Sequence, residues 1–344
     1  MSFFSSDPPD AASADASTPW KPLAAVGGLL AGVAATGKAL RWARQQTLPV
    51  GPLSPPALDA TLEPFELMEG TARCYHRPGT GTPLVFVHSF NAAASSYEMK
   101  PLFEHYAETT DRPLFALDWL GFGLSDRPDI VYRPALFQRQ LRRFLSERVP
   151  AAADVIALSL GGEYAASVAL TSPFLVRSLV LISPTSLGAR SNVKPTRKAL
   201  IHSLAATGAF ELFFYRLARR VSIRSYYERQ VFQDAADVDE ALVDYAYLTA
   251  NVKGAHHAPR YFVAGDLFLS EAARTAYAKL QVPTLMVIPD LPGETIQRFE
   301  RLAHTRARNA DYLRVHSIKA GLMPQWDQRP ALTDAIDAFT NASS

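Results

Sequence analysis

Short apolar runs alternate with amphipathic segments along most of the chain, from about residue 70 onward. The apolar runs predict strands at 72–76, 83–88, 113–118, 155–158, 176–182, 283–288 and 312–318. The segments between them predict helices at 92–107, 134–148, 163–170 and 294–307. Strands that are apolar on both faces and are followed by helices are typical of a parallel sheet covered on both sides. The sequence therefore predicts an α/β fold with a mostly parallel, doubly wound sheet.

The alternation lapses between about residues 188 and 278. This segment has helical patterns throughout and is rich in aromatic residues, which include Phe210, Phe213, Phe214, Tyr215, Tyr226 and Tyr227. Sheets of this class bind their ligands at the carboxyl ends of the strands. We therefore expect the segment to form a helical cap, inserted in the sheet domain and lying over these ends.

The first 69 residues follow other patterns. Residues 1–20 are rich in Ser, Asp, Pro and Ala without periodicity and predict a disordered tail. Residues 21–45 contain the apolar run 22–40, which predicts one helix, and the Pro-containing stretch 46–69 is interpreted as a linker. The sheet domain with its cap is then expected over 70–344.

Two interpretations of the apolar run 22–40 stay open. Its length is close to the ~20 apolar residues that cross a bilayer, which favours a membrane anchor. In that case Lys38, Arg41 and Arg44 would keep the folded domain on the cytoplasmic side. The alternative is an amphipathic helix that lies on the folded domain. Either way we expect a cytoplasmic protein, with membrane association through residues 22–40 in the first case.

Composition narrows the range of partners. The chain is 48% hydrophobic and 20% charged, so it can bury a large core. Its net charge of +2 and its lack of long Lys/Arg blocks argue against a nucleic-acid partner. The single cysteine, Cys74, excludes an intramolecular disulfide and is expected to be buried and inert. We expect no metal and no cofactor.

The sequence ALSLG at 157–161 has the form of a nucleophile elbow. An apolar strand ends in Ser159, a helix begins after it, and small residues stand two positions away on either side, at Ala157 and Gly161. Small residues are needed there because the backbones of the strand and the helix pass close together. The pattern predicts that Ser159 occupies a sharp turn with a positive φ.

Two further motifs precede the elbow, and the three together resemble the α/β-hydrolase family with a helical cap. They are VHSFN at 87–91, DWLGFGLSD at 118–126 and ALSLG at 157–161, in the order of the family. The resemblance implies Ser159 as nucleophile, with the backbone N–H groups of Leu160 and Phe90 as the oxyanion hole. It also shows that Ser89 stands where the family usually has glycine, which would shift the loop, since serine does not freely adopt a positive φ.

The rest of the family's catalytic triad is altered. A serine needs a histidine to take its proton and an acid to orient that histidine. In the turn 318–330, Leu322 occupies the position of the family's histidine. The acid's loop reads PDLPGE at 289–294, in which Asp290 is either the displaced acid or a solvated turn residue.

Other histidines are weighed as replacements for the missing base. His256 and His257 in the cap are either a base that reaches Ser159 when the cap closes or a polar turn between helices. His88 is interpreted as a loop-shaping residue, His304 as solvent-exposed, and His316 as a sheet residue about 20 Å from the site.

Two functions therefore remain open. The first is a serine hydrolase that acts on apolar carboxylic esters or related acyl compounds through Ser159. The second is a noncatalytic protein of the same fold that binds an apolar ligand or a protein partner. Loss of the histidine of a serine triad can lower turnover about a millionfold, which weighs against the first. The Ser159 nucleophile also argues against a dehalogenase, whose nucleophile is an aspartate.

Overall fold

The computed structural model describes residues 39, 42, 46–49, 54–187, 195–269, 276–290 and 304–342. The predicted tail at 1–20 and residues 22–38 of the apolar run lie outside the described residues. Within the described part of the chain, no helix is both long enough and apolar enough to cross a bilayer.

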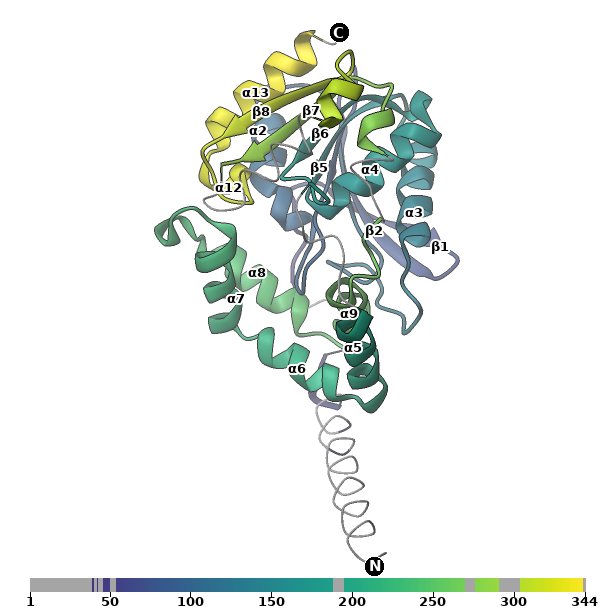
Figure 1. Cartoon of the computed structure of the whole chain (residues 1–344), viewed down its shortest axis with the longest axis vertical. Helices are drawn as coiled ribbons and strands as arrows, with labels where there is room; N and C mark the ends of the chain where they lie inside the picture. The colour runs from purple at the N-terminus through teal and green to yellow at the C-terminus, as the bar shows by residue number, and fades with distance from the viewer. Residues whose placement is uncertain are drawn as a thin grey trace, which may run out of the picture.

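One eight-stranded sheet forms the centre of the molecule (Figure 1). Its order is β1-β2-β4-β3-β5-β6-β7-β8. The strands are β1 Thr61–Leu67, β2 Gly70–Arg77, β3 Leu84–Val87, β4 Leu114–Asp118, β5 Ala153–Leu158, β6 Val176–Ile182, β7 Thr284–Pro289 and β8 Leu313–Ile318. β2 pairs antiparallel with β1 and with β4, and every pairing from β4 to β8 is parallel. The predicted fold class, a mostly parallel α/β sheet, is confirmed.

Helices cover both faces of this sheet. α3 (Pro134–Glu147) and α4 (Leu160–Thr171) pack on one face, where their apolar side chains share a core with β3 and β5. α2 (Lys100–Thr109) and α13 (Arg329–Ala342) pack on the other face. Cys74 is buried as expected, and burial raises the pKa of its thiol to about 11.

Two sequence predictions are corrected here. Residues 61–67, assigned to a linker, form β1 and pair with β2 along its whole length. Only Phe65 of β1 is buried, so this edge strand lacks the apolar run on which the prediction relied. The helix predicted from residue 92 begins later, with the 3-10 turn η1 (Ser96–Met99) followed by α2.

The chain between β6 and β7 carries the helical insertion. Its elements are α5 (Pro195–Thr207), α6 (Ala209–Leu217), α7 (Arg220–Tyr226), η4 (Tyr227–Val231), η5 (Ala235–Asp237), α8 (Glu240–Ala250) and α9 (His257–Ala264), and η6 (Tyr277–Lys279) leads into β7. The helices α5 to α9 form a layer below the sheet in Figure 1, and a small apolar core around Phe210, Phe214 and Tyr215 lies within this layer. We call this layer the cap.

The cap contacts the loops that follow the carboxyl ends of the central strands. After β3, Tyr97 stacks on Tyr245 of α8, with ring centroids 4.2 Å apart. After β4, Arg127 donates hydrogen bonds to the carbonyls of Gly123 (2.5 Å) and Thr249 (3.1 Å), which joins this loop to α8. The cap therefore lies at the end of the sheet where ligands of this fold class bind.

Candidate active site

Ser159 stands between β5 and α4 with φ 54° and ψ −124°. This is a backbone region that residues other than glycine rarely enter, at a cost on the order of 1–3 kcal/mol. Its amide donates a 2.8 Å hydrogen bond to the carbonyl of Ile182 in β6, which holds the turn against the neighbouring strand. The predicted sharp turn with a positive φ at Ser159 is confirmed.

The surroundings of Ser159 are closely packed, yet Ser159 itself remains accessible. A Cβ atom on Gly161 would lie 2.5 Å from the carbonyl oxygen of His88, so the helix can only approach this loop because residue 161 is glycine. Every other residue from 153 to 166 is buried, whereas Ser159 is partly exposed. The turn therefore presents one hydroxyl at the end of an otherwise buried strand and helix.

None of the histidines contacts this hydroxyl. All eight histidines of the chain lie in the described segments, at positions 76, 88, 105, 202, 256, 257, 304 and 316. Across these segments, no side chain of any kind makes a hydrogen bond to the Ser159 hydroxyl. The imidazole that a serine triad requires is therefore not present at Ser159 in this structure.

His88 is fixed inside the loop after β3. Its Nε2 accepts a 3.1 Å hydrogen bond from the amide of Trp119, so its proton is on Nδ1, which donates to the carbonyl of Ser89 at 2.8 Å. Burial lowers the pKa of His88 to about 4, so the ring is neutral at physiological pH. These contacts agree with a residue that shapes the loop.

The two cap histidines are held by other groups. His256 Nε2 lies 3.6 Å from the buried carboxylate of Glu211, and His257 Nδ1 is 2.9 Å from the carbonyl of Arg127. Burial is the main cause that lowers the pKa of His257. The structure does not bring either ring to Ser159. His304 and His316 are exposed.

The turn that contains Leu322 is attached to the cap. The amide of Leu322 donates a 2.6 Å hydrogen bond to the carbonyl of Val231. The Asp327 carboxylate accepts hydrogen bonds from the amides of Gly321 (2.8 Å) and Gln233 (3.4 Å). The Leu322 side chain is half-buried and packs against the apolar core on the α2 face of the sheet. Leu322 therefore acts as an apolar contact in this turn.

Asp290 follows the end of β7, where its amide donates a 2.8 Å hydrogen bond to the carbonyl of Ile318. Its side chain is exposed and makes no hydrogen bond to the residues described here. The loop from 291 to 303 lies outside the described residues. The role of Asp290 as catalytic acid remains a prediction.

The two predicted oxyanion residues flank the elbow. Leu160 is the first residue of α4, so its amide is one of those that have no acceptor within the helix. The Phe90 ring is buried between Trp119, Phe122 and Tyr164, with centroid distances of 5.4, 5.2 and 5.3 Å. This packing fixes the position of the Phe90 backbone beside β3. The oxyanion role of both amides stays a prediction.

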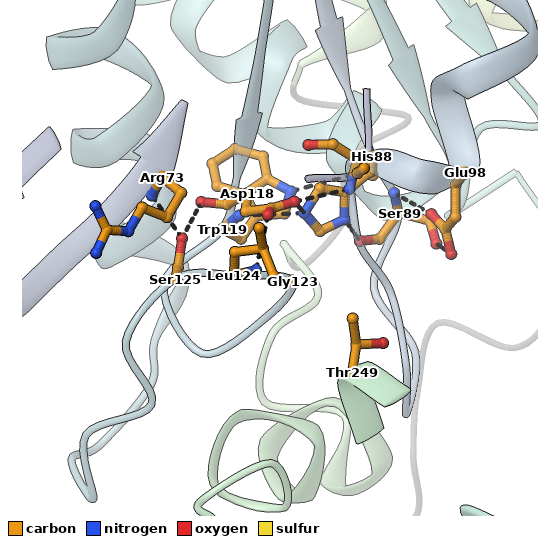
Figure 2. Close-up of polar contacts among 12 residues, drawn as sticks. Arg73, His88, Ser89, Glu98, Asp118, Trp119, Gly123, Leu124, Ser125 and Thr249 are labelled. Carbon is orange, nitrogen blue, oxygen red and sulfur yellow. Dashed lines mark hydrogen bonds and ion pairs between the residues drawn. The ribbon is translucent and has the colours of Figure 1, made fainter. Parts of the chain in front are cut away.

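A buried carboxylate, Glu98, organises the loop that carries Phe90 (Figure 2). Glu98 accepts hydrogen bonds from the Ser89 amide (2.9 Å), the Ser89 hydroxyl (3.0 Å) and the Asn91 side-chain amide (2.7 Å). Burial raises the pKa of Glu98 to about 7, although the three hydrogen bonds oppose this. Ser89, which the sequence predicts to stand in the family's glycine position, has no positive φ and supplies two donors to Glu98.

The carboxylate of Asp118 holds the loop after β4, at 118–126, in a similar way. Its carboxylate is fully buried and accepts hydrogen bonds from the amides of Ser96 and Leu124, each 2.8 Å, and from the Tyr75 hydroxyl at 3.4 Å. Figure 2 shows it at the centre of this network, between His88 and Ser125. Sequence reasoning missed both Glu98 and the role of Asp118 as an acceptor, since neither belongs to a pattern of known chemistry.

The elbow, the two preceding loops and the sheet order together define an α/β-hydrolase-type site, and residues 84–334 match the alpha/beta hydrolase family. The chain belongs to this family. Over 155 residues it is 30% identical to the 1-acylglycerol-3-phosphate O-acyltransferase ABHD5 of Rattus norvegicus, and the match covers 43% of each chain. The chain thus spans less than half the length of that relative.

A longer match exists to a bacterial enzyme. The chain is 24% identical over 263 residues to the 2-hydroxy-6-oxo-6-(2'-aminophenyl)hexa-2,4-dienoic acid hydrolase of Metapseudomonas resinovorans, which covers 70% of this chain and 79% of that one. Among solved structures, Cfl2 of Burkholderia cenocepacia is similar with a TM-score of 0.64 and 20% identity, over 85% of this chain and 99% of that one. This likeness supports the fold.

Proposed function

We propose that this protein binds an apolar acyl compound beside Ser159, under the cap, and is not an efficient hydrolase. One observation carries the proposal: Ser159 is accessible at an intact elbow, while all eight histidines of the chain lie elsewhere. A serine hydroxyl without a base stays protonated at neutral pH and is a weak nucleophile. The elbow then offers a hydroxyl and the free amide of Leu160 as hydrogen-bonding groups for a carboxyl or ester group.

The names of the relatives support the choice of an acyl ligand. One relative is named as an acyltransferase and the other as a hydrolase of a dienoic acid. Both names refer to compounds with a carboxyl-derived group, which is the group that two amides at an elbow can hold. The apolar character of the ligand is inferred from the apolar residues around the elbow, which include Phe90, Leu158 and Leu160.

A serine hydrolase acting on apolar esters is the second candidate. The strained backbone of Ser159 favours it, because a conformation that costs 1–3 kcal/mol is typical of a residue that reacts. In this alternative, Ser159 attacks the acyl carbon and the amides of Phe90 and Leu160 hold the oxyanion. Asp290 or a cap histidine takes part in the proton transfer after a movement of the cap.

Selective blocking of position 159 tests the binding proposal. In Ser159→Cys, the new thiol is accessible, whereas Cys74 is buried and its high pKa makes it unreactive toward a maleimide. We expect Ser159→Cys to bind a fluorescent fatty acid before alkylation and to lose at least tenfold in affinity afterwards, while maleimide-treated wild-type protein keeps its affinity. Unchanged binding after complete alkylation of residue 159 would contradict the proposal.

Reaction with a fluorophosphonate probe separates the two candidates. The binding proposal predicts labelling of Ser159 far slower than that of a serine hydrolase with a complete triad, and ester turnover that Ser159→Ala does not change. Rapid labelling of the wild-type protein, together with ester turnover that Ser159→Ala removes, would favour the hydrolase.

A further inference from the structure

Large apolar side chains are exposed where α6 meets α7 in the cap. Val221 is 81% exposed, Phe213 48% and Leu217 45%. Phe213 and Leu217 are four residues apart and therefore lie on one face of α6. The adjacent face of α6 buries Phe210 and Phe214 in the cap core. The three exposed apolar side chains are therefore not part of the cap's own apolar core.

Two arginines lie among these apolar residues. Arg216 and Arg219 are exposed, and neither forms an ion pair with any of the described residues. Two neighbouring arginines do form ion pairs, Arg220 with Asp244 and Arg224 with Glu228. We define Phe213, Arg216, Leu217, Arg219 and Val221 as the cap corner. It combines apolar side chains with two positive charges that have no partner among the described residues.

The N-terminal part of the chain joins the molecule at the cap. Leu48 packs against the cap core, and the amide of Lys253 donates a 3.1 Å hydrogen bond to the carbonyl of Pro49. In sequence, the chain before this point combines apolar and basic residues, as the cap corner does. Residues 22–37 contain no charged residue, and Lys38, Arg41 and Arg44 follow them.

We propose that the cap corner is a membrane-binding surface that contacts a bilayer containing anionic lipids. Apolar side chains flanked by arginines suit the boundary between head groups and acyl chains, and anionic head groups would neutralise Arg216 and Arg219. A second copy of the chain fits less well, because a two-fold interface would bring two sets of unpaired arginines together. The surface goes beyond the proposed ligand site at Ser159 and does not depend on it.

Co-sedimentation of the full chain with vesicles tests this surface. We expect binding to vesicles of phosphatidylcholine with phosphatidylserine to be at least tenfold stronger than to phosphatidylcholine alone. Each basic residue near an anionic surface contributes about fivefold, so Arg216→Glu with Arg219→Glu should weaken binding by about 25-fold or more. Leu217→Glu with Val221→Glu should weaken it at least tenfold.

Phe174→Glu is the matched control. Phe174 is 74% exposed but lies in the turn before β6, outside the cap, so its replacement should leave vesicle binding unchanged. Circular dichroism of each variant checks that the fold is intact. Three results would overturn the proposal: no binding of wild-type protein to anionic vesicles, equal binding to neutral vesicles, or binding that survives both double substitutions. Loss of a dimer in Leu217→Glu with Val221→Glu, without vesicle binding by the wild type, would identify a protein interface instead.

Discussion

The amide of Leu322 and the carbonyl of Val231 form a 2.6 Å hydrogen bond that joins the core to the cap. The sequence predicts that Leu322 occupies the position of the family's histidine, and the turn that contains it is attached to the end of η4. A side chain at residue 322 therefore has limited freedom to change direction.

Leu322→His places an imidazole at this position. We expect it to increase fluorophosphonate labelling of Ser159 and short-chain ester turnover by about tenfold to a hundredfold, the range of a base whose orienting acid is imperfect. Gel-based labelling and p-nitrophenyl acetate hydrolysis measure the change.

The same experiment needs Ser159→Ala in the Leu322→His background, which should remove both signals. A larger gain than a hundredfold would show that Asp290, or another carboxylate, reaches the new ring. No gain at all, in a folded variant, would mean that the turn does not direct residue 322 toward Ser159.

Backbone strain at Ser159 gives a second prediction. Because the φ of 54° and ψ of −124° suit glycine alone, Ser159→Gly should be more stable than Ser159→Ala by about 1 kcal/mol in free energy of unfolding. Urea denaturation of both variants measures the difference. Equal stability would show that residue 159 is not strained.

Two adjacent glycines in α4 give a third prediction. A Cβ on Gly161 would lie 2.5 Å from the backbone carbonyl of His88, whereas a Cβ on Gly162 would lie 3.0 Å from a terminal methyl group of Leu181 and at ordinary contact distance, 3.9 Å, from the carbonyl of Ala157. Gly161→Ala should therefore lower the free energy of unfolding by about 3 kcal/mol or more. Gly162→Ala should change it by less than about 1 kcal/mol, because better helix propensity offsets the contact. Similar losses for both would contradict this account.

The pKa of Glu98 makes stability depend on pH. Burial raises that pKa from 4.5 to about 7, so the folded protein keeps a proton that the unfolded chain releases between these values. Glu98 therefore lowers the free energy of unfolding as the pH rises from about 4.5 to about 7. In Glu98→Gln this loss is absent. The variant's stability relative to wild type should rise by roughly 2–3 kcal/mol from pH 5 to pH 8.

Chemical denaturation of both proteins at several pH values measures this change. Any loss of stability from the altered hydrogen bonds that does not depend on pH cancels when the stability differences at two pH values are compared. Glu108→Gln, on the exposed side of α2, is the control and should shift by less than about 0.5 kcal/mol. A constant difference between Glu98→Gln and wild type across this pH range would show that Glu98 titrates normally.

The sequence was sufficient to predict Ser159 and the central strands, because both depend on local patterns. Ser159 sits between an apolar strand and a helix with small neighbours, and β3 to β7 consist mainly of apolar residues. β1 could not be predicted, because it buries only Phe65 and is defined by pairing with β2.

Glu98 shows why part of the site escapes prediction. Nothing in the sequence around residue 98 distinguishes it from an exposed helix carboxylate. Its burial follows from the packing of η1 beneath the loop after β3, which brings Ser89 and Asn91 to the same carboxylate. The loss of the triad's histidine at position 322 remains a prediction from one motif position, and it agrees with the observation that no imidazole contacts the Ser159 hydroxyl.

The absence of an imidazole at Ser159 affects the removal of an acyl group as much as its attachment. Water that hydrolyses an acyl-serine must itself be activated by the triad's base. If an activated ester transferred its acyl group to the Ser159 oxygen, its acyl–oxygen bond would break and its alcohol would leave with the serine proton. The acyl-serine would then persist, and the elbow would retain one acyl group per molecule. Mass spectrometry would show the acylated protein as a mass increase of one acyl group per molecule. The acyl-serine would outlast the complex of the protein with the acyl donor.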